Sequence, residues 1–183
     1  MKQAIIIYGS RYGTTKLFAS QLSQMTGIPC ISYREVKNIQ DYNQIIYLGA
    51  LYAGTVLGLK SVGKKISTNQ KLIIATVGLV DPADPDNIKY IRDNVKTVIP
   101  EKLYDESMIF HLWGAIDYST MNFKHRIMMS LMHSKLSKKP IEKLNIEEKT
   151  ILDTYGKKVD YVDLQALETM ANTITLIARK DNM

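Results

Sequence analysis

Five short runs of continuously apolar, largely β-branched residues constrain the fold of this chain more than any other feature. The runs cover residues 4–8, 30–33, 45–48, 72–77 and 108–112. A strand covered on both faces needs continuous rather than alternating apolarity. Stretches with helical spacing lie between the runs, and parallel strands need such crossover connections. The pattern therefore predicts an α/β fold, an open doubly wound sheet of five parallel strands with helices on both faces.

Three connecting segments carry apolar side chains at helical intervals, at residues 15–25, 86–98 and 163–177. In the first segment the apolar positions form a stripe one face wide, as expected of a helix that packs on a sheet. Thr14 or Thr15 can cap its start, and Gly27 followed by Pro29 can end it. We expect a helix directly after the first strand, a second after the proline-rich residues 81–85, and a third near the carboxyl end.

The segment from residue 117 to residue 161 exceeds what a five-stranded sheet needs. It contains an amphipathic stretch at 123–136 and a concentration of positive charge. Between residues 123 and 143 there are six Lys or Arg (positions 124, 126, 135, 138, 139 and 143) against the single acid Glu142, a local excess of five in a chain whose net charge is +6. We expect one domain over residues 1–183, with a basic amphipathic insertion at about 117–161.

The single cysteine and the scattered histidines limit the chemistry of the chain. Cys30 cannot form an internal disulfide, and three separated histidines do not supply the ligands of a zinc cluster. We therefore expect a reducing compartment, a Cys30 that acts as a small buried hydrophobe, and no metal site. The first residues lack the pattern of a signal peptide, and no apolar run approaches the ~20 residues of a membrane helix. A cytoplasmic location follows, with peripheral contact at the inner face of a membrane left open.

The residues between the first strand and the first helix form the most informative motif. Residues 9–16 read Gly-Ser-Arg-Tyr-Gly-Thr-Thr-Lys. At the carboxyl end of a parallel strand, a helix start presents unpaired N–H groups and partial positive charge, which suits a phosphate. Ser10, Thr14 and Thr15 add hydroxyl donors, and Gly13 permits a close backbone approach. Arg11 either adds charge or points to solvent. The spacing matches neither a P-loop nor the dinucleotide G-x-G-x-x-G motif, and an ordinary βα turn is the alternative.

This motif carries a family resemblance. Ile7-Tyr8-x-Ser10-x-x-Gly13-x-Thr15 resembles the phosphate loop of flavodoxin-like FMN proteins. A closer resemblance is to the flavodoxin-type, menaquinone-dependent protoporphyrinogen dehydrogenases of bacteria. That match is carried by the phosphate loop and by three further features: Leu48-Gly49-Ala50 with Tyr52 and Gly54, Gly114-Ala115-Ile116 with Tyr118, and the methionine-rich basic segment 123–139.

The resemblance implies a strand order of 2-1-3-4-5 and an FMN cofactor. It places the phosphate at Ser10, Arg11, Tyr12, Gly13, Thr14 and Thr15. The flavin ring would lie between the loop after the third strand (Leu51, Tyr52, Ala53 and Gly54) and the loop after the fourth (Thr76, Val77, Gly78 and Leu79). Flavodoxins commonly place an aromatic side chain on each side of the ring. Here Tyr52 is the only aromatic candidate, which argues against a tightly clasped one-electron carrier.

Several isolated residues have two interpretations. His111 and Trp113 fall on one face of the fifth strand, where core packing is favoured over a flavin contact. Asp117 and Tyr118 follow that strand and can position a substrate or relay a proton, but Asp117 is at least as well suited to capping a loop. His125 and His133 are too far apart for a paired metal site. No acid, base or nucleophile stands out, so we assign no catalytic side chain.

The stretch 123–136 has three interpretations. Its apolar residues are placed on one side of a helix: Phe123, Ile127, Met128, Leu131, Met132 and Leu136. Such a helix can lie in an anionic membrane surface, line a hydrophobic substrate cleft, or simply pack on the sheet or on a second subunit of a homo-oligomer. Nucleic-acid binding is disfavoured, because no stacking aromatics interleave the basic residues.

The sequence thus indicates an FMN-binding oxidoreductase. If the closer resemblance holds, it oxidises the tetrapyrrole protoporphyrinogen IX and passes electrons through FMN to a quinone. Two alternatives stay open. One is a non-enzymatic electron carrier between redox proteins, and the other is a cofactor-free interaction module.

Overall fold

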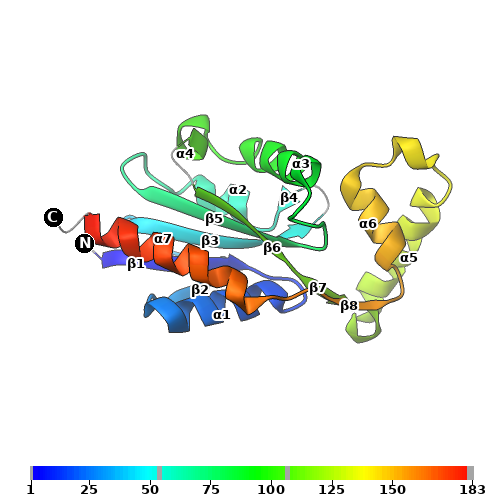
Figure 1. Ribbon diagram of the computed structural model, residues 1–183, viewed down its shortest axis with the longest axis horizontal. Helices are drawn as coiled ribbons and strands as arrows, with labels where there is room; N and C mark the ends of the chain where they lie inside the picture. The colour runs from blue at the N-terminus through cyan, green and yellow to red at the C-terminus, as the bar shows by residue number, and fades with distance from the viewer. Residues whose placement is uncertain (1, 53–54, 106–107, 181–183) are drawn as a thin grey trace.

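The fold is built on a parallel sheet with the strand order β2-β1-β3-β5-β6, as shown by a computed structural model that describes residues 2–52, 55–105 and 108–180 (Figure 1). These strands are β1 (Lys2–Gly9), β2 (Cys30–Ser32), β3 (Tyr42–Tyr52), β5 (Lys71–Gly78) and β6 (Met108–Trp113). The short strand β4 (Thr55–Val56) pairs antiparallel with the end of β3. The predicted α/β class, the five parallel strands and their order are confirmed.

Helices cover both faces of the sheet. On one face lie α1 (Thr14–Thr26) and α7 (Leu167–Lys180), and on the other lie α2 (Leu59–Gly63), α3 (Pro85–Lys96) and α4 (Glu101–Asp105) (Figure 1). The central position of β3 in the sheet explains why its sequence is continuously apolar. Ile45 and Tyr47 join the core under α2 and α3, whereas Ile46 and Leu48 join the core under α1 and α7. Neither face of the strand is left for polar side chains.

The ends of the helices follow the predictions in part. Gly27 adopts a left-handed φ of 70° and ends α1 as predicted. The predicted threonine cap at its start is wrong, because Gly13 is the N-cap residue, with φ 101° and no side-chain hydrogen bond. Thr14 and Thr15 already belong to the first turn of the helix. The predicted helix 163–177 begins as a short 3₁₀ helix, η3 (Leu164–Ala166), before α7 continues it.

The insertion leaves the sheet after β6 and returns before α7. It consists of β7 (Ala115–Asp117), η1 (Tyr118–Thr120), α5 (Phe123–Leu136), η2 (Ile141–Lys143), α6 (Ile146–Thr154) and β8 (Lys158–Asp160). The antiparallel pairing of β7 with β8 closes its base, a strand pair that the sequence did not predict. We call this unit the insert. In Figure 1 its two helices lie beyond one end of the sheet.

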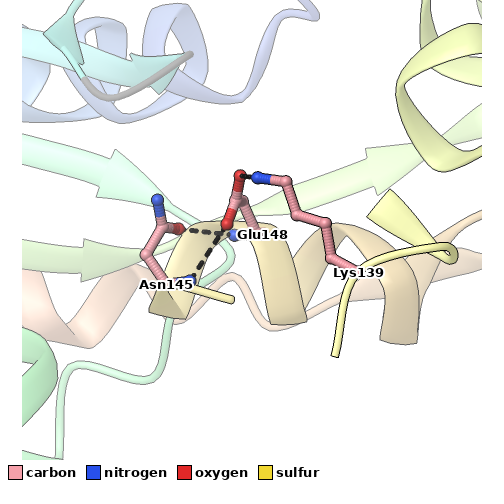
Figure 2. Close-up of polar contacts among 3 residues, drawn as sticks. All are labelled: Lys139, Asn145 and Glu148. Atoms are coloured by element: carbon pink, nitrogen blue, oxygen red, sulfur yellow. Dashed lines mark hydrogen bonds and ion pairs between the residues drawn. The ribbon is translucent and has the colours of Figure 1, made fainter. Parts of the chain in front are cut away.

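Local polar contacts define the start of α6. The Asn145 side chain accepts a hydrogen bond from the Glu148 backbone N–H, and the Glu148 carboxylate accepts one from the Asn145 N–H (Figure 2). This reciprocal capping box satisfies two backbone donors at the helix start. Lys139 Nζ lies 2.8 Å from the same carboxylate and ties the preceding loop to α6. None of the described helices is both long enough and apolar enough to cross a lipid bilayer.

Candidate functional site

The loop of residues 10–13 leads from the carboxyl end of β1 directly into α1. The Gly13 N–H donates to Ser10 Oγ at 3.2 Å, which closes the turn. A Cβ added at Gly13 would meet nothing within 4 Å, so open space adjoins the start of the helix. Because no side chain caps α1, the N–H groups of its first turn remain available to an anion. The predicted phosphate loop therefore has suitable donor geometry.

Arg11 and Tyr12 in this loop contact α5 of the insert. Arg11 Nη2 lies 2.5 Å from His125 Nε2, and because a guanidinium only donates, the imidazole nitrogen accepts. The same guanidinium lies 4.6 Å from the centroid of the Tyr52 ring. Tyr12 meets His125 edge-on at 5.8 Å, and partial burial raises the pKa of the Tyr12 hydroxyl. Arg11 thus neither points freely into solvent nor lies isolated at the helix start.

The residues predicted for the two ring loops lie mainly at strand ends. Leu51 and Tyr52 are the last residues of β3, and Thr76 to Gly78 are the last of β5. The prediction that these residues form loops is wrong, because the pairing of β3 extends to Tyr52, opposite Thr55, and that of β5 extends to Gly78, opposite Trp113. Leu51 packs on Gly78 so closely that a Cβ there would lie 2.7 Å from the Leu51 side chain. Glycine at this position lets the two strand ends approach each other.

Thr76 has a structural partner instead of a place in a ring loop. It is buried inside β5, and its hydroxyl lies 2.8 Å from His111 Nδ1. The hydroxyl therefore contacts a neighbouring strand of the sheet rather than a ligand. Two further residues predicted for the ring loops, Ala53 and Gly54, lie outside the described residues.

One cavity joins the start of α1 to the ends of β3 and β5. Most of the predicted cofactor residues line it, namely Ser10, Arg11, Tyr12, Thr14, Thr15, Leu51, Tyr52, Val77, Gly78 and Leu79. The cavity also reaches into the insert, where Met129 and Met132 of α5 and Thr150 and Ile151 of α6 form a further wall. Three interpretations of stretch 123–136 were open. The position of Met129 and Met132 in the cavity wall agrees with the one in which the helix lines a cleft.

The aromatic side chains around the cavity are more numerous than the sequence indicated. Tyr12 and Tyr118 line it together with Tyr52. The Tyr52 hydroxyl lies 3.2 Å from the Met128 sulfur of α5. Distant parts of the chain bring these rings together, so the spacing of residues in a single loop did not reveal them.

Trp113 positions the chain segment that follows β5. Its indole N–H donates to the Leu79 carbonyl at 3.0 Å, and its ring stacks on Tyr161 with 4.2 Å between centroids. The Tyr161 N–H donates in turn to the Gly114 carbonyl. Trp113 therefore holds Leu79, which lines the cavity, and connects it to Tyr161, the residue that follows β8. The sequence favoured a packed tryptophan but did not indicate this link to Leu79.

Four other residues that the sequence singled out, Asp117, His111, His133 and Cys30, have structural surroundings rather than ligand-binding ones. The Asp117 carboxylate accepts from the Ser119 hydroxyl at 2.6 Å and from its N–H, which caps η1 and lowers the pKa of Asp117. Burial lowers the pKa of His111 to about 4, with a smaller contribution from the charge of Arg92. His133 stacks on Tyr155. Cys30 is half-buried in β2 and packs beside the α1 core. In the described part of the chain, no three His, Cys, Asp or Glu residues gather as a metal site.

Comparison with known proteins gives the family. Residues 5–143 match the flavodoxin domain, which is more than half of the chain and runs from β1 through η2. The chain belongs to the flavodoxin domain family. Membership in this family supports FMN as the cofactor. No curated protein matches the chain.

Several solved structures of flavoproteins are similar to the chain at low sequence identity. A flavoprotein from Lactobacillus acidophilus in complex with FMN is 12% identical, with 62% of this chain and 93% of that chain covered and a TM-score of 0.45. Oxidised flavodoxin 2 from Bacillus cereus is 11% identical, with 92% and 99% covered and a TM-score of 0.40. A point mutant of flavodoxin from Pseudomonas aeruginosa is 12% identical, with 70% and 93% covered and a TM-score of 0.41.

The described residues fit the chemistry of a flavin mononucleotide. An uncapped helix start with the Ser10 hydroxyl beside it offers donors to a phosphate, whereas the Thr14 hydroxyl donates to the Ala115 carbonyl at 3.3 Å. Farther along the same cavity, Leu51, Val77 and Tyr52 offer the apolar and aromatic surfaces that a flavin ring needs. The polar and apolar ends of the cavity therefore match the two ends of the cofactor.

Proposed function

We propose that this flavodoxin-domain protein is an FMN-dependent oxidoreductase. The phosphate of FMN would bind at residues 10–15, and the ring would bind beside the ends of β3 and β5. The observation that carries the proposal is the single cavity that joins the uncapped start of α1 to these strand ends. FMN, when bound, supplies the redox chemistry, and the protein supplies binding, orientation and electrostatics.

The residues around the cavity have distinct roles in this proposal. The first-turn N–H groups of α1, which include that of Thr14, and the hydroxyl of Ser10 would hold the phosphate. Tyr52, fixed between Arg11 and Met128, would contact the ring. The positive charge of Arg11 at the mouth of the cavity favours negative charge on whatever binds there. A unit charge ~4 Å away is worth about 4 kcal/mol at an effective dielectric of ~20, before screening.

The substrate belongs to the same proposal. We infer oxidation of protoporphyrinogen IX, with electrons passed through FMN to a quinone. Each oxidation step would remove two electrons and two protons from the porphyrinogen, and the quinone would accept both. Two observations support a large apolar anionic substrate. Met129, Met132 and Ile151 make one wall of the cavity apolar, and the insert concentrates the positive charge of the chain, which would attract propionates.

The proposal extends to the organisation and location of the chain. We propose that residues 1–183 form one domain in the cytoplasm, at the inner face of the membrane in which a quinone dissolves. One cavity wall comes from the insert and the others from the sheet, which supports a single folding unit. Coincident unfolding transitions by far-ultraviolet circular dichroism and by Trp113 fluorescence would be the expected result.

The binding test compares two glycines that both have positive φ and at which a Cβ would find open space, Gly13 and Gly27. Gly27 is in the left-handed helical region, whereas Gly13, with φ 101° and ψ −30°, lies outside it. Gly27→Ala should therefore cost about 1 kcal/mol of stability and Gly13→Ala about 2 kcal/mol. Only Gly13 lies at the proposed phosphate site. We expect Gly13→Ala to raise the Kd for FMN at least tenfold in a flavin fluorescence titration, and Gly27→Ala to leave it unchanged. Equal Kd values for both variants would contradict this placement of the phosphate.

The substrate test uses the protein reconstituted with FMN and desalted. Under anaerobic conditions we expect porphyrin fluorescence to rise when both porphyrinogen and a quinone are present, and not when either is left out. Retained FMN without this turnover would favour an electron carrier. Loss of all flavin on desalting would favour a cofactor-free interaction module, and would remove the basis of the proposed function.

A further inference from the structure

Helix α5 bears apolar side chains on two opposite sides. Met129 and Leu136 face the body of the insert and are 6% and 4% exposed. Phe123, Ile127 and Leu131 are 75%, 46% and 68% exposed. The sequence prediction that all its apolar residues share one side is therefore wrong. The insert core and the cavity take up one side of α5, and the other remains in solvent.

The three exposed residues form a continuous stripe. They are spaced four residues apart, so they lie one above the other along successive turns of the helix. We call Phe123, Ile127 and Leu131 the outer stripe. The adjoining cavity is lined by Met129 and Met132 of the inner side, and none of the outer stripe lines it. The outer stripe is thus separate from the proposed cofactor and substrate site.

Basic side chains border the outer stripe on both sides. At about 100° per residue, Lys124 and Lys135 lie on one side of it and Arg126 on the other. All three are exposed. The loop after α5 adds Lys138, which is also exposed. The outer surface of α5 therefore presents an apolar stripe flanked by cations, which suits contact with a membrane interface, the stripe toward the acyl chains and the cations at the level of the headgroups.

Charge decides among the occupants of this surface. A second copy of the chain would bring the same concentration of positive charge against the first and would be repelled. An anionic lipid surface is complementary to it, and each Lys or Arg near such a surface adds attraction. We infer that the outer stripe and its basic border dock this protein on an anionic lipid bilayer. The inference rests on the outer surface of α5 and does not depend on the identity of the cofactor or substrate.

The test measures binding of the full chain to large vesicles by co-sedimentation. The vesicles are pure phosphatidylcholine or a mixture with phosphatidylglycerol. We expect binding to the anionic vesicles that weakens with added salt, and little binding to the neutral ones. The double variant Phe123→Ser with Leu131→Ser should lower the partition coefficient at least tenfold. The variant Lys124→Glu, Arg126→Glu and Lys135→Glu should remove the preference for anionic lipid.

A matched control separates this stripe from general surface apolarity. Met25 and Leu176 are also exposed apolar side chains, at 41% and 58%, but they lie on α1 and α7. The double variant Met25→Ser with Leu176→Ser should bind anionic vesicles as the unchanged chain does. The Kd for FMN should stay the same in every one of these variants, which separates failure of this inference, and of the membrane location proposed above, from failure of the proposed FMN site.

Three results would overturn the inference. The first is equal binding to neutral and anionic vesicles, or to neither. The second is an unchanged partition coefficient for the Phe123→Ser, Leu131→Ser variant. The third is a dimer in light scattering that this variant converts to a monomer without any effect of vesicles, which would assign the outer stripe to self-association instead.

Discussion

The sheet and the insert bury their apolar side chains to very different degrees. In β3, residues 45–48 are all fully buried, and large cores lie on both faces of the sheet. The insert has one small core cluster, formed by Ile116, Tyr118, Met121 and Met129, and also buries Leu136 and Leu144. Its longest helix leaves three large apolar residues exposed. Buried apolar area is the main source of folding free energy, so most of the stability of the protein lies in the sheet.

The insert depends on contacts with the sheet for its position. These include the stack of Trp113 on Tyr161 and the contacts of Arg11 and Tyr52 with α5. One wall of the cavity is therefore rigid and the other belongs to a region of lower local stability. Regions that adapt to ligands generally have low local stability. The difference suits a site that holds a cofactor firmly on one side and admits a substrate on the other.

The largest contrast between the two regions is expected from a pair of leucines. Leu48 in β3 is fully buried, whereas Leu131 in α5 is 68% exposed. Leu48→Ala should lower the free energy of unfolding by about 3 kcal/mol, because it leaves a cavity in the core. Leu131→Ala should change it by less than about 0.5 kcal/mol. Urea unfolding followed by circular dichroism measures both, and similar losses would contradict this division of stability.

Acid sensitivity is expected to arise in the sheet, at His111. The pKa of His111 is lowered from 6.5 to about 4 in the folded protein, mainly by burial. The unfolded chain therefore binds a proton between these pH values that the folded chain does not. Stability is complete above pH ~6.5 and falls as the pH drops toward ~4, by about 2 kcal/mol after allowance for partial exposure. The measurement is urea unfolding between pH 7 and 4.

Two variants test the cause of this pH dependence. His111→Gln removes the titrating group, so the fall in stability attributed to His111 should disappear. Thr76→Val removes the hydroxyl that contacts His111 Nδ1 but keeps the site buried. The fall should persist in that variant, because burial is the larger cause. If Thr76→Val abolishes it, the hydrogen bond rather than burial controls the pKa.

The sequence predicted the sheet well because its signals are local. Each buried strand is a continuous apolar run, and the phosphate loop is contiguous between β1 and α1. The exact ends of β3 and β5 were missed, because Leu51, Tyr52 and Gly78 extend the ladder through pairing with neighbouring strands rather than through apolarity. Pairing with neighbouring strands determines these ends, and the residue pattern within one segment holds no information about that pairing.

The insert was less predictable because its contacts join residues far apart in the chain. Arg11 and His125 are 114 positions apart, and Tyr52 and Met128 are 76 apart. The sequence prediction also assigned the apolar residues of α5 to one side, although a helix that is apolar on opposite sides gives no single stripe. The exposure of each side chain in the structure distinguishes the buried side from the exposed one. The methionines of the stretch were the one local signal of a cleft lining.

The anchor between the insert and the sheet gives a smaller expected effect. Tyr161→Ala removes the stack on Trp113 and should cost about 1 kcal/mol. We expect amide hydrogen exchange to become faster, with β7 and β8 opening at a lower free energy than β1 and β3. Tyr161→Phe keeps the ring and is the matched control. Equal opening free energies in β7, β8, β1 and β3 of Tyr161→Ala would show that the two regions open only together and would remove the contrast between them.

The smallest expected effect lies within the insert, at the ion pair of Lys139 with Glu148 (Figure 2). Both side chains are partly exposed, at 39% and 23%, and exposed ion pairs contribute little because water and salt screen them. Lys139→Met should lower the free energy of unfolding by only about 0.3 kcal/mol. Asn145→Ala, which removes the cap of the same helix, should cost about 1 kcal/mol. The two variants, compared by urea unfolding, separate charge from capping at one site. A larger loss from Lys139→Met would mean that the charge of the insert contributes to its folding as well as to the surface it presents.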